Sequence, residues 1–308
     1  MTESQRGLAY GLGAYIIWGT FPLYFTLLEP TSPVEVLANR ILWSCVVLFG
    51  LVIVGHRWSA IAPVLRDRRR LVLLAAASAM IAINWGFFIY GVTSNQVVQT
   101  SLGYFINPLV SVVFGVVLLH ERLRRTQWVA VGLGVAAVAV LSFDYGQVPW
   151  IALVLALSFG SYGLLKKVLD MGAVESLSVE TALLTPLAAA YLGYLVATGT
   201  SAWSTGDTSM TLLLASTGVV TIVPLLLFSA AATRIPLTWI GLLQYTTPVL
   251  QFATGVFILN EPMPASRWVG FSLVWIALVT LAVDSAAAVR RGRSRTQLEI
   301  TERAQEAH

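Results

Sequence analysis

Two ionisable residues, Arg40 and Glu180, lie within long apolar stretches of the sequence. A charged side chain at the centre of a bilayer costs about 2.5–3.5 kcal/mol on insertion scales, so each residue needs a reason to be there. The functional reason is binding of a substrate or a proton, and the structural reason is snorkelling or a hydrogen bond near a helix end. A carboxylate in a low-dielectric cavity is costly to keep charged and can take up a proton. We therefore predict substrate binding for Arg40 and proton coupling for Glu180.

Amide and aromatic side chains recur on other apolar segments. Proline inside a helix frees a carbonyl one turn earlier, and Pro108 and Pro248 would free those of Tyr104 and Gln244 towards a cavity. Besides Arg40, the residues expected to bind substrate or line the cavity are Asn84, Trp85, Tyr104, Asn107, Gln244, Tyr245, Trp18 and Tyr162. The alternatives are interhelical hydrogen bonds for the polar groups and interfacial anchoring for the tryptophans. Helix breaks or hinges are expected at Pro108, Pro248 and Pro224.

Other site chemistry finds little support in the sequence. The three histidines, His56, His120 and His308, lie in predicted loops or in the tail, and the chain has one cysteine. These residues form no metal cluster, catalytic dyad or disulfide, so we expect no metal, no cofactor and no enzyme activity. Glu121 and Glu261 occupy loop turns, where we expect each to cap or brace the helix that follows.

The elements that hold these residues are predicted to be membrane-spanning helices. Of 308 residues, 57% are hydrophobic and 11% are charged, where a soluble domain carries roughly 25% charged residues. Apolar stretches approach the ~20 residues that cross a ~30 Å hydrocarbon core. Ten spans are predicted, near 8–28, 34–54, 71–92, 96–119, 127–143, 148–168, 176–198, 208–230, 237–259 and 267–286.

The basic residues give the predicted orientation. They form short runs between apolar segments, as in 57–70 and at Lys166-Lys167, which indicates topology signals near helix ends rather than a nucleic-acid surface. With both termini in the cytoplasm, almost all of them fall on the inside and only Arg267 falls outside. The basic tail, 289–308, has little to bury and is predicted to be disordered and cytoplasmic.

The chain also resembles itself at an offset of 140 positions. The offset aligns Val34-Glu35 with Val174-Glu175, Pro108 with Pro248, Glu121 with Glu261 and Trp128 with Trp268. Five spans in each half make the second copy inverted, and its loops have lost the matching positive charges. This predicts a first repeat over 1–145 and a second, inverted repeat over 146–288. Arg40 and Glu180 align at this offset but fall at different depths, which predicts two separate sites.

Several motifs resemble one known family. They are Asn39-Arg40-Ile41-Leu42-Trp43-Ser44, Asn84-Trp85, the stretch Ser101 to Leu109 and Gln244-Tyr245 with Pro248. The chain is similar in these to RarD-type permeases, in the EamA branch of the drug/metabolite transporter superfamily. The resemblance implies ten helices, a central cavity between the halves and a bacterial inner membrane.

Together these observations predict an all-α integral membrane protein, with ten transmembrane helices as two inverted five-helix repeats around a central cavity. Its expected function is secondary-active transport of a small organic metabolite or drug, as an exporter or permease, by alternating access. A passive channel or lipid scramblase is the alternative, and an intramembrane enzyme is the least favoured reading. The expected partners are the lipid bilayer and a small-molecule substrate, with protons and a second copy of the chain in a homodimer as further candidates.

Overall fold

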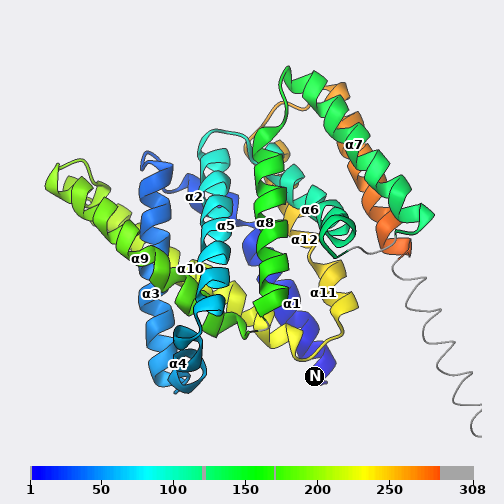
Figure 1. Ribbon diagram of the computed structural model, residues 1–308. Coiled ribbons are helices and arrows are strands. Elements are labelled where there is room, and N and C mark those ends of the chain that lie inside the picture. Colours follow the sequence, from blue (N-terminus) through cyan, green and yellow to red (C-terminus); the bar gives the residue numbers. More distant parts are fainter. Residues whose placement is uncertain (1, 120–122, 170, 285–308) are drawn as a thin grey trace, which may run out of the picture. The chain divides into compact units, whose positions relative to one another are not determined.

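The computed structural model describes residues 2–119, 123–169 and 171–284, and the regular elements of these residues are all helices (Figure 1). Eight helices in this part of the chain are long and apolar enough to cross a membrane. They are α3 (Pro33–Val54), α5 (Arg68–Thr93), α6 (Val97–Leu119), α7 (Arg125–Tyr145), α8 (Trp150–Leu169), α9 (Ala173–Ala197), α10 (Thr208–Ala232) and the helix over Ala265–Asp284. The all-α prediction is confirmed for the described residues.

The other two predicted spans are interrupted. The segment 8–28 forms α1 (Glu3–Gly19) and α2 (Phe21–Thr26), and 237–259 forms α11 (Leu237–Leu243), α12 (Thr246–Ala253) and a π-helical turn η2 (Thr254–Ile258). Pro22 has no N–H to bond the Trp18 carbonyl, and the first helix ends beside this position. Pro248 likewise cannot bond the Gln244 carbonyl, and the break falls at Gln244 and Tyr245. The interruption of 237–259 thus lies next to Pro248, where a break or hinge is expected, whereas the interruption of 8–28 is not predicted from the sequence.

The two remaining predicted breaks are not seen. Helix α6 continues through Pro108 and helix α10 continues through Pro224. A long helix tolerates one lost hydrogen bond when neighbouring helices support it, so these prolines do not end their helices. A hinge role for either proline stays a prediction.

The chain divides into two compact units. Unit 1 comprises Met1–Asn107 and Trp150–Pro262, and unit 2 comprises Pro108–Pro149 and Met263–His308. Each unit combines segments from both predicted repeats, because the chain passes from one unit to the other and back. The boundary between repeats at 145 and 146 stays a prediction. The tail 289–308 lies outside the described residues.

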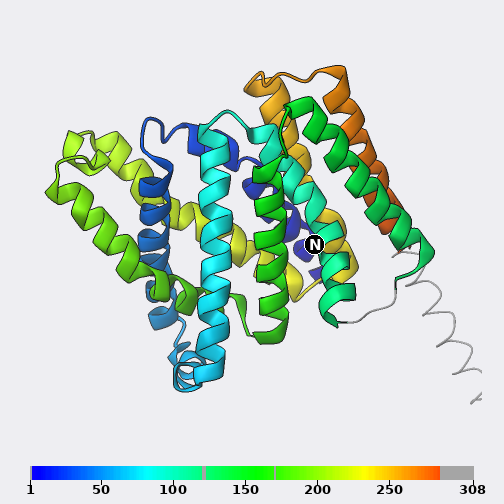
Figure 2. The ribbon, with the colours of Figure 1, turned by 45° about the horizontal axis from the view of Figure 1, so that its top comes forward.

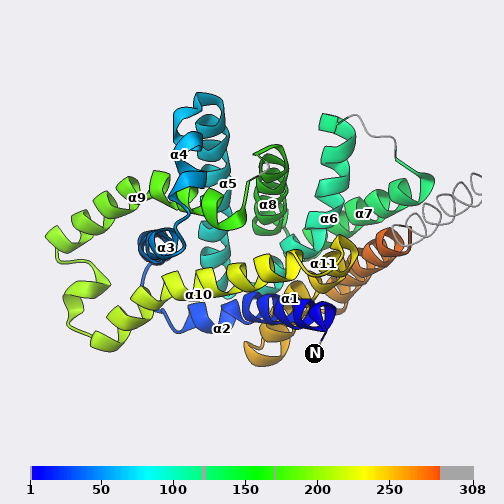
Figure 3. The same ribbon diagram turned by 90° about the horizontal axis from the view of Figure 1, so that it is seen from below.

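Unit 1 is built from pairs of packed helices. Helix α5 packs along α8, α1 packs along α10, and α3 contacts both α9 and α10 (Figures 2 and 3). Helices α3 and α10 approach closely at Gly218, where a Cβ atom would lie 2.5 Å from the carbonyl oxygen of Trp43. Close backbone approach at small residues is how membrane helices gain packing energy, since lipid supplies no hydrophobic driving force between them.

Two glutamates near the starts of α3 and α9 connect these helices to distant loops. Glu35 is 4% exposed, and its Oε1 accepts hydrogen bonds from Ser201 Oγ and the Ala202 backbone N–H, each at 2.8 Å. Glu175 Oε1 lies 2.6 Å from Arg57 Nη1, beyond the end of α3. The two ends of the α3–α9 pair are thus held by different kinds of bond, one to neutral donors and one to a guanidinium.

Glu261 caps a helix, as the sequence predicts, but a different one. Its Oε1 accepts from the Val97 backbone N–H at 2.5 Å and its Oε2 from the Val98 N–H at 2.9 Å, which caps α6. A helix N-terminus has unsatisfied N–H groups and a partial positive charge, so a carboxylate is well placed there. That Glu261 also braces the following helix stays a prediction, and Glu121 lies outside the described residues.

A short helix, α4 (Trp58–Arg66), lies between α3 and α5, where the sequence predicts a basic loop. Ile61 and Val64, three residues apart, point to one face and are buried against Val52 and Leu74. Trp58, three residues before Ile61 in the first turn of α4, is 57% exposed. Helix α4 is therefore amphipathic, and positive charge flanks it on both sides in the sequence.

Unit 2 contains a pair of antiparallel helices, α7 and the helix over Ala265–Asp284, which run side by side (Figure 1). Arg124 Nη1 lies 2.8 Å from Asp284 Oδ2 at one end, and Arg267 Nε lies 2.9 Å from Asp144 Oδ2 at the other. Opposite charges at both ends fix the antiparallel register of this pair.

Candidate functional site

Arg40 lies about two turns into α3, which begins at Pro33 after the N-cap Ser32. Its side chain is buried, with the residue 3% exposed, and its Nε donates a hydrogen bond to Thr221 Oγ1 on α10 at 2.9 Å. Because membrane helices offer few polar groups, this bond fixes the side chain between α3 and α10.

Three aromatic rings surround the Arg40 guanidinium. Its central carbon lies 4.1 Å from the ring centroid of Trp85 on α5, and 5.5 Å from those of Phe21 and Phe25 on α2. The faces of these rings attract a cation, and a desolvated cation–π contact is worth about 2 kcal/mol. The sequence predicts Arg40 and Trp85 as site residues but misses Thr221 and the two phenylalanines, because chain distance hides their proximity.

Glu180 is fully buried in α9 and has two partners on α8. Lys166 Nζ lies 2.9 Å from its Oε1, and the Tyr162 hydroxyl donates to its Oε2 at 3.0 Å. Lys166 also hydrogen-bonds to Ser176 Oγ. The group therefore contains a carboxylate, an ammonium and a phenol in one buried cluster.

The sequence predicts Lys166 to be a topology residue at a helix end, yet its ammonium pairs with Glu180 inside the protein. The spacing of residues in the sequence does indicate this cluster. Tyr162 and Lys166 are four residues apart, as are Ser176 and Glu180, so each pair shares one face of its helix. Arg40 and Glu180 make no ion pair with each other, and each has its own set of neighbours.

Asn84 joins three helices. Its Nδ2 donates to the Leu155 carbonyl at 3.1 Å and to Ser158 Oγ at 3.2 Å on α8, and its Oδ1 accepts from the Tyr104 hydroxyl of α6 at 3.1 Å. Asn84 immediately precedes Trp85, so this network supports the same part of α5 that holds the ring against Arg40. Asn84, Trp85 and Tyr104 are thus brought together with Arg40.

The remaining predicted lining residues lie in other surroundings. Trp18 packs against Tyr15 and Phe228, with ring centroids 5.5 and 5.9 Å away. Gln244 and Tyr245 are half-buried at the break between α11 and α12, and Asn107 is half-buried in α6. A cavity-lining role for these residues stays a prediction.

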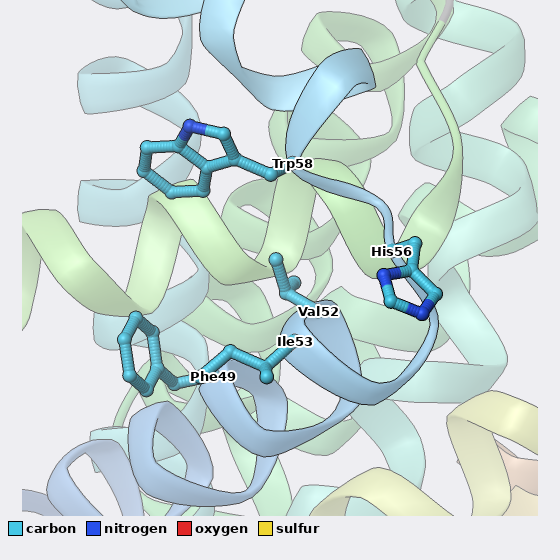
Figure 4. A pocket seen from close by; sticks show the side chains of 5 residues that line it. All are labelled: Phe49, Val52, Ile53, His56 and Trp58. Atoms are coloured by element: carbon cyan, nitrogen blue, oxygen red, sulfur yellow. The ribbon is translucent and has the colours of Figure 1, made fainter.

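Two pockets of the described residues lie away from these clusters. One, of about 370 Å³, is lined by Phe49, Val52, Ile53, His56 and Trp58 where α3 meets α4 (Figure 4). The other is lined by Asp67, Arg69, Arg70, Leu73, Val168 and Leu169, at the start of α5 and the end of α8. Neither includes a predicted site residue, and Arg40 and Glu180 are closed over by their neighbours in this structure.

Long apolar helices that bury charged side chains and a tyrosine–amide network are typical of membrane transport proteins. The model of the EamA-like transporter family matches residues 5–143. The chain belongs to this family, and within it to the RarD-type permeases, as its relatives show.

A protein RarD from Streptomyces exfoliatus is 51% identical over 96% of this chain and 94% of its own length. A protein RarD from Escherichia coli (strain K12) is 38% identical over 94% of this chain and 98% of its own length. A chloramphenicol-sensitive protein RarD from Pseudomonas aeruginosa is 30% identical over 94% of this chain and 98% of its own length.

Solved structures are similar as well, among them a crystal structure with a TM-score of 0.57 and 16% identity over 92% of this chain and 98% of that chain. At that identity the likeness shows the fold alone. The chain is a membrane transporter with a small-molecule substrate, and its bacterial relatives place it in the inner membrane.

Proposed function

We propose that the protein is a secondary-active transporter that carries a small organic solute by alternating access between two inverted five-helix repeats. The observation that carries the proposal is the pair of buried charges, Arg40 and Glu180, at corresponding positions of the two predicted repeats. Buried ionisable groups in membrane helices mark substrate or ion pathways, because leaving them in lipid without a role is costly.

The helix packing of unit 1 supports the repeat. At an offset of 140 positions, α10 corresponds to α5, α9 to α3 and, with a small slip, α8 to α1. The close pairs α1–α10 and α8–α5 therefore correspond to each other, and α3 packs on its own counterpart α9. Such exchange of partners is expected of inverted repeats related by a pseudo-twofold axis in the membrane plane.

The proposal includes proton coupling at Glu180. During transport this carboxylate would exchange its bond to Lys166 for a proton, so that it is not left charged without a partner, while the Lys166 ammonium keeps its bond to Ser176 and its partial exposure. A permanent structural ion pair is the alternative. The proposal also places both termini in the cytoplasm, on the distribution of basic residues along the sequence.

Uptake into proteoliposomes tests the proposal. Chloramphenicol is one neutral probe, because a relative from Pseudomonas aeruginosa is called chloramphenicol-sensitive, and a broad solute screen by thermal stabilisation supplies others. We expect saturable uptake that a pH gradient accelerates, and loss of that acceleration in Glu180→Gln but not in Lys167→Gln, an exposed neighbour of Lys166. Uptake that does not saturate, or that ignores the gradient, would favour a passive channel or scramblase.

A further inference from the structure

We infer that Arg40 binds the negatively charged group of the transported solute, and that the substrate is a small organic monocarboxylate. This inference rests on the proposed transport function and specifies its ligand. Four features support it. They are the N–H donors of the guanidinium that have no acceptor, the bonds of the acids of unit 1 to other groups, the single positive charge of Arg40, and the aromatic rings around it.

The first feature is the set of N–H groups that the protein leaves without an acceptor. A guanidinium has five N–H donors. Arg40 Nε donates to Thr221, and the described residues supply no hydrogen-bond acceptor to either Nη atom. The rings of Phe21, Phe25 and Trp85 attract the charge but do not replace oxygen acceptors. A buried charge with unmet donors is unfavourable, so a ligand with oxygen acceptors would bind favourably here.

The second feature is that four acids of unit 1, three of them buried, are bound to other groups. Glu35, on the same helix as Arg40, accepts from Ser201 and Ala202. Glu180 is paired with Lys166. Glu261 caps α6, and Glu175 is paired with Arg57, as described above. No carboxylate of the described residues lies within ion-pair distance of Arg40, so its counter-charge has to come from outside this part of the chain.

The third feature concerns the charge and shape of the ligand. A planar guanidinium can bind a carboxylate through two parallel N–H···O bonds. A doubly charged phosphate would need a second cation beside Arg40, and Lys166, the partly buried base of α8, is already engaged by Glu180. The single charge of the Arg40 guanidinium therefore favours a singly charged carboxylate.

The fourth feature is the surroundings of the guanidinium. The three aromatic rings would face the organic part of a bound solute, which favours an apolar or aromatic body over a strongly hydrated one. Arg40 is closed over in this structure, so binding requires α2 or α10 to move away from α3. Such movement is part of alternating access.

Matched pairs of acids and amides provide the test. The melting temperature of the purified protein in lipid nanodiscs is measured with acetate and acetamide, benzoate and benzamide, and indole-3-acetate and indole-3-acetamide. A ligand that binds the folded state raises the melting temperature. We expect at least one carboxylate to raise it while its amide does not.

The variants are Arg40→Gln, Arg40→Lys and the control Arg6→Gln, an arginine on the exposed start of α1. Loss of charge-assisted hydrogen bonds should weaken carboxylate binding about 10- to 100-fold in Arg40→Gln. Arg40→Lys should retain part of the affinity, because it keeps the charge but loses the two parallel donors. The control should bind like the wild type.

If Arg40→Gln does not fold, Thr221→Val takes its place, since it removes only the hydroxyl that orients the guanidinium. It should weaken carboxylate binding, and the amides should still give no shift. The inference is overturned if no carboxylate gives a shift absent from its amide, or if the shift survives both Arg40→Gln and Thr221→Val. Saturable uptake of chloramphenicol or another neutral solute would still support transport, so the two failures can be told apart.

Discussion

Removing Lys166 should destabilise the protein more than removing its partner. Glu180 is 0% exposed, whereas the side chain of Lys166 is 21% exposed and reaches a more polar environment. The substitution Lys166→Met leaves a fully buried carboxylate with only the Tyr162 hydroxyl as a donor. Breaking a buried pair by removing one partner costs about 3–5 kcal/mol, and the complete burial of Glu180 places this variant in that range.

The reverse substitution should cost less. Glu180→Gln removes the buried charge and keeps a side chain that can accept from Tyr162. Lys166 keeps its bond to Ser176 and its partial exposure. We expect a loss of about 1 kcal/mol. The double variant Lys166→Met with Glu180→Gln carries no buried charge and should recover most of the stability lost in Lys166→Met alone.

Reversible unfolding in mixed micelles, followed by the fluorescence of the 10 tryptophans, gives the free energies needed for this cycle. Lys167→Met is the matched control, because Lys167 is adjacent and exposed. It should lie within about 0.5 kcal/mol of the wild type. A double variant no more stable than Lys166→Met would refute the reasoning, since it would show that the buried charge is not what makes the single variant unstable.

Three further predictions concern the helix contacts and the topology. Gly218→Leu should lower the free energy of unfolding by about 1–3 kcal/mol in the same assay, because its side chain would meet the Trp43 carbonyl. Glu261→Ala should cost about 0.5–2 kcal/mol and speed amide hydrogen exchange in the first turn of α6, where unchanged exchange would contradict the capping role. In a background without the native cysteine, Arg68→Cys should react with a membrane-impermeant thiol reagent only from the cytoplasm and Asp207→Cys only from outside; the opposite pattern would reverse the proposed topology.

The sequence predicts the class of fold and the burial of the two charges, because both depend on composition along single helices. Arg40 and Glu180 are identified by being charged within apolar segments, and both are buried. The partner of Arg40 could not be predicted in the same way. Thr221 is 181 residues from Arg40, and only the packing of α10 on α3 brings the two together.

The role of Lys166, helix α4 and the break within 8–28 are not predicted, and in each case the local sequence explains why. Lys166 lies near a helix end and in a pair of lysines, a pattern that also fits a topology signal. Helix α4 was missed because Ile61 and Val64 give only one turn of helical spacing within a basic segment, too short to predict a helix. The break in 8–28 could have been predicted from Pro22, but the length and apolarity of the segment favoured one span.

The two glutamate connections of α3 and α9 should respond differently to dissolved salt. Glu175 and Arg57 have 14% and 50% of their side chains exposed, so mobile ions can reach and screen this pair. Glu35 is 4% exposed and bonds to neutral donors, so ionic strength should leave it almost unchanged. Raising the salt concentration would then loosen one end of the helix pair selectively. In purified protein we therefore expect the Glu175–Arg57 end of the α3–α9 pair to open more easily than the Glu35 end as the ionic strength of the buffer rises.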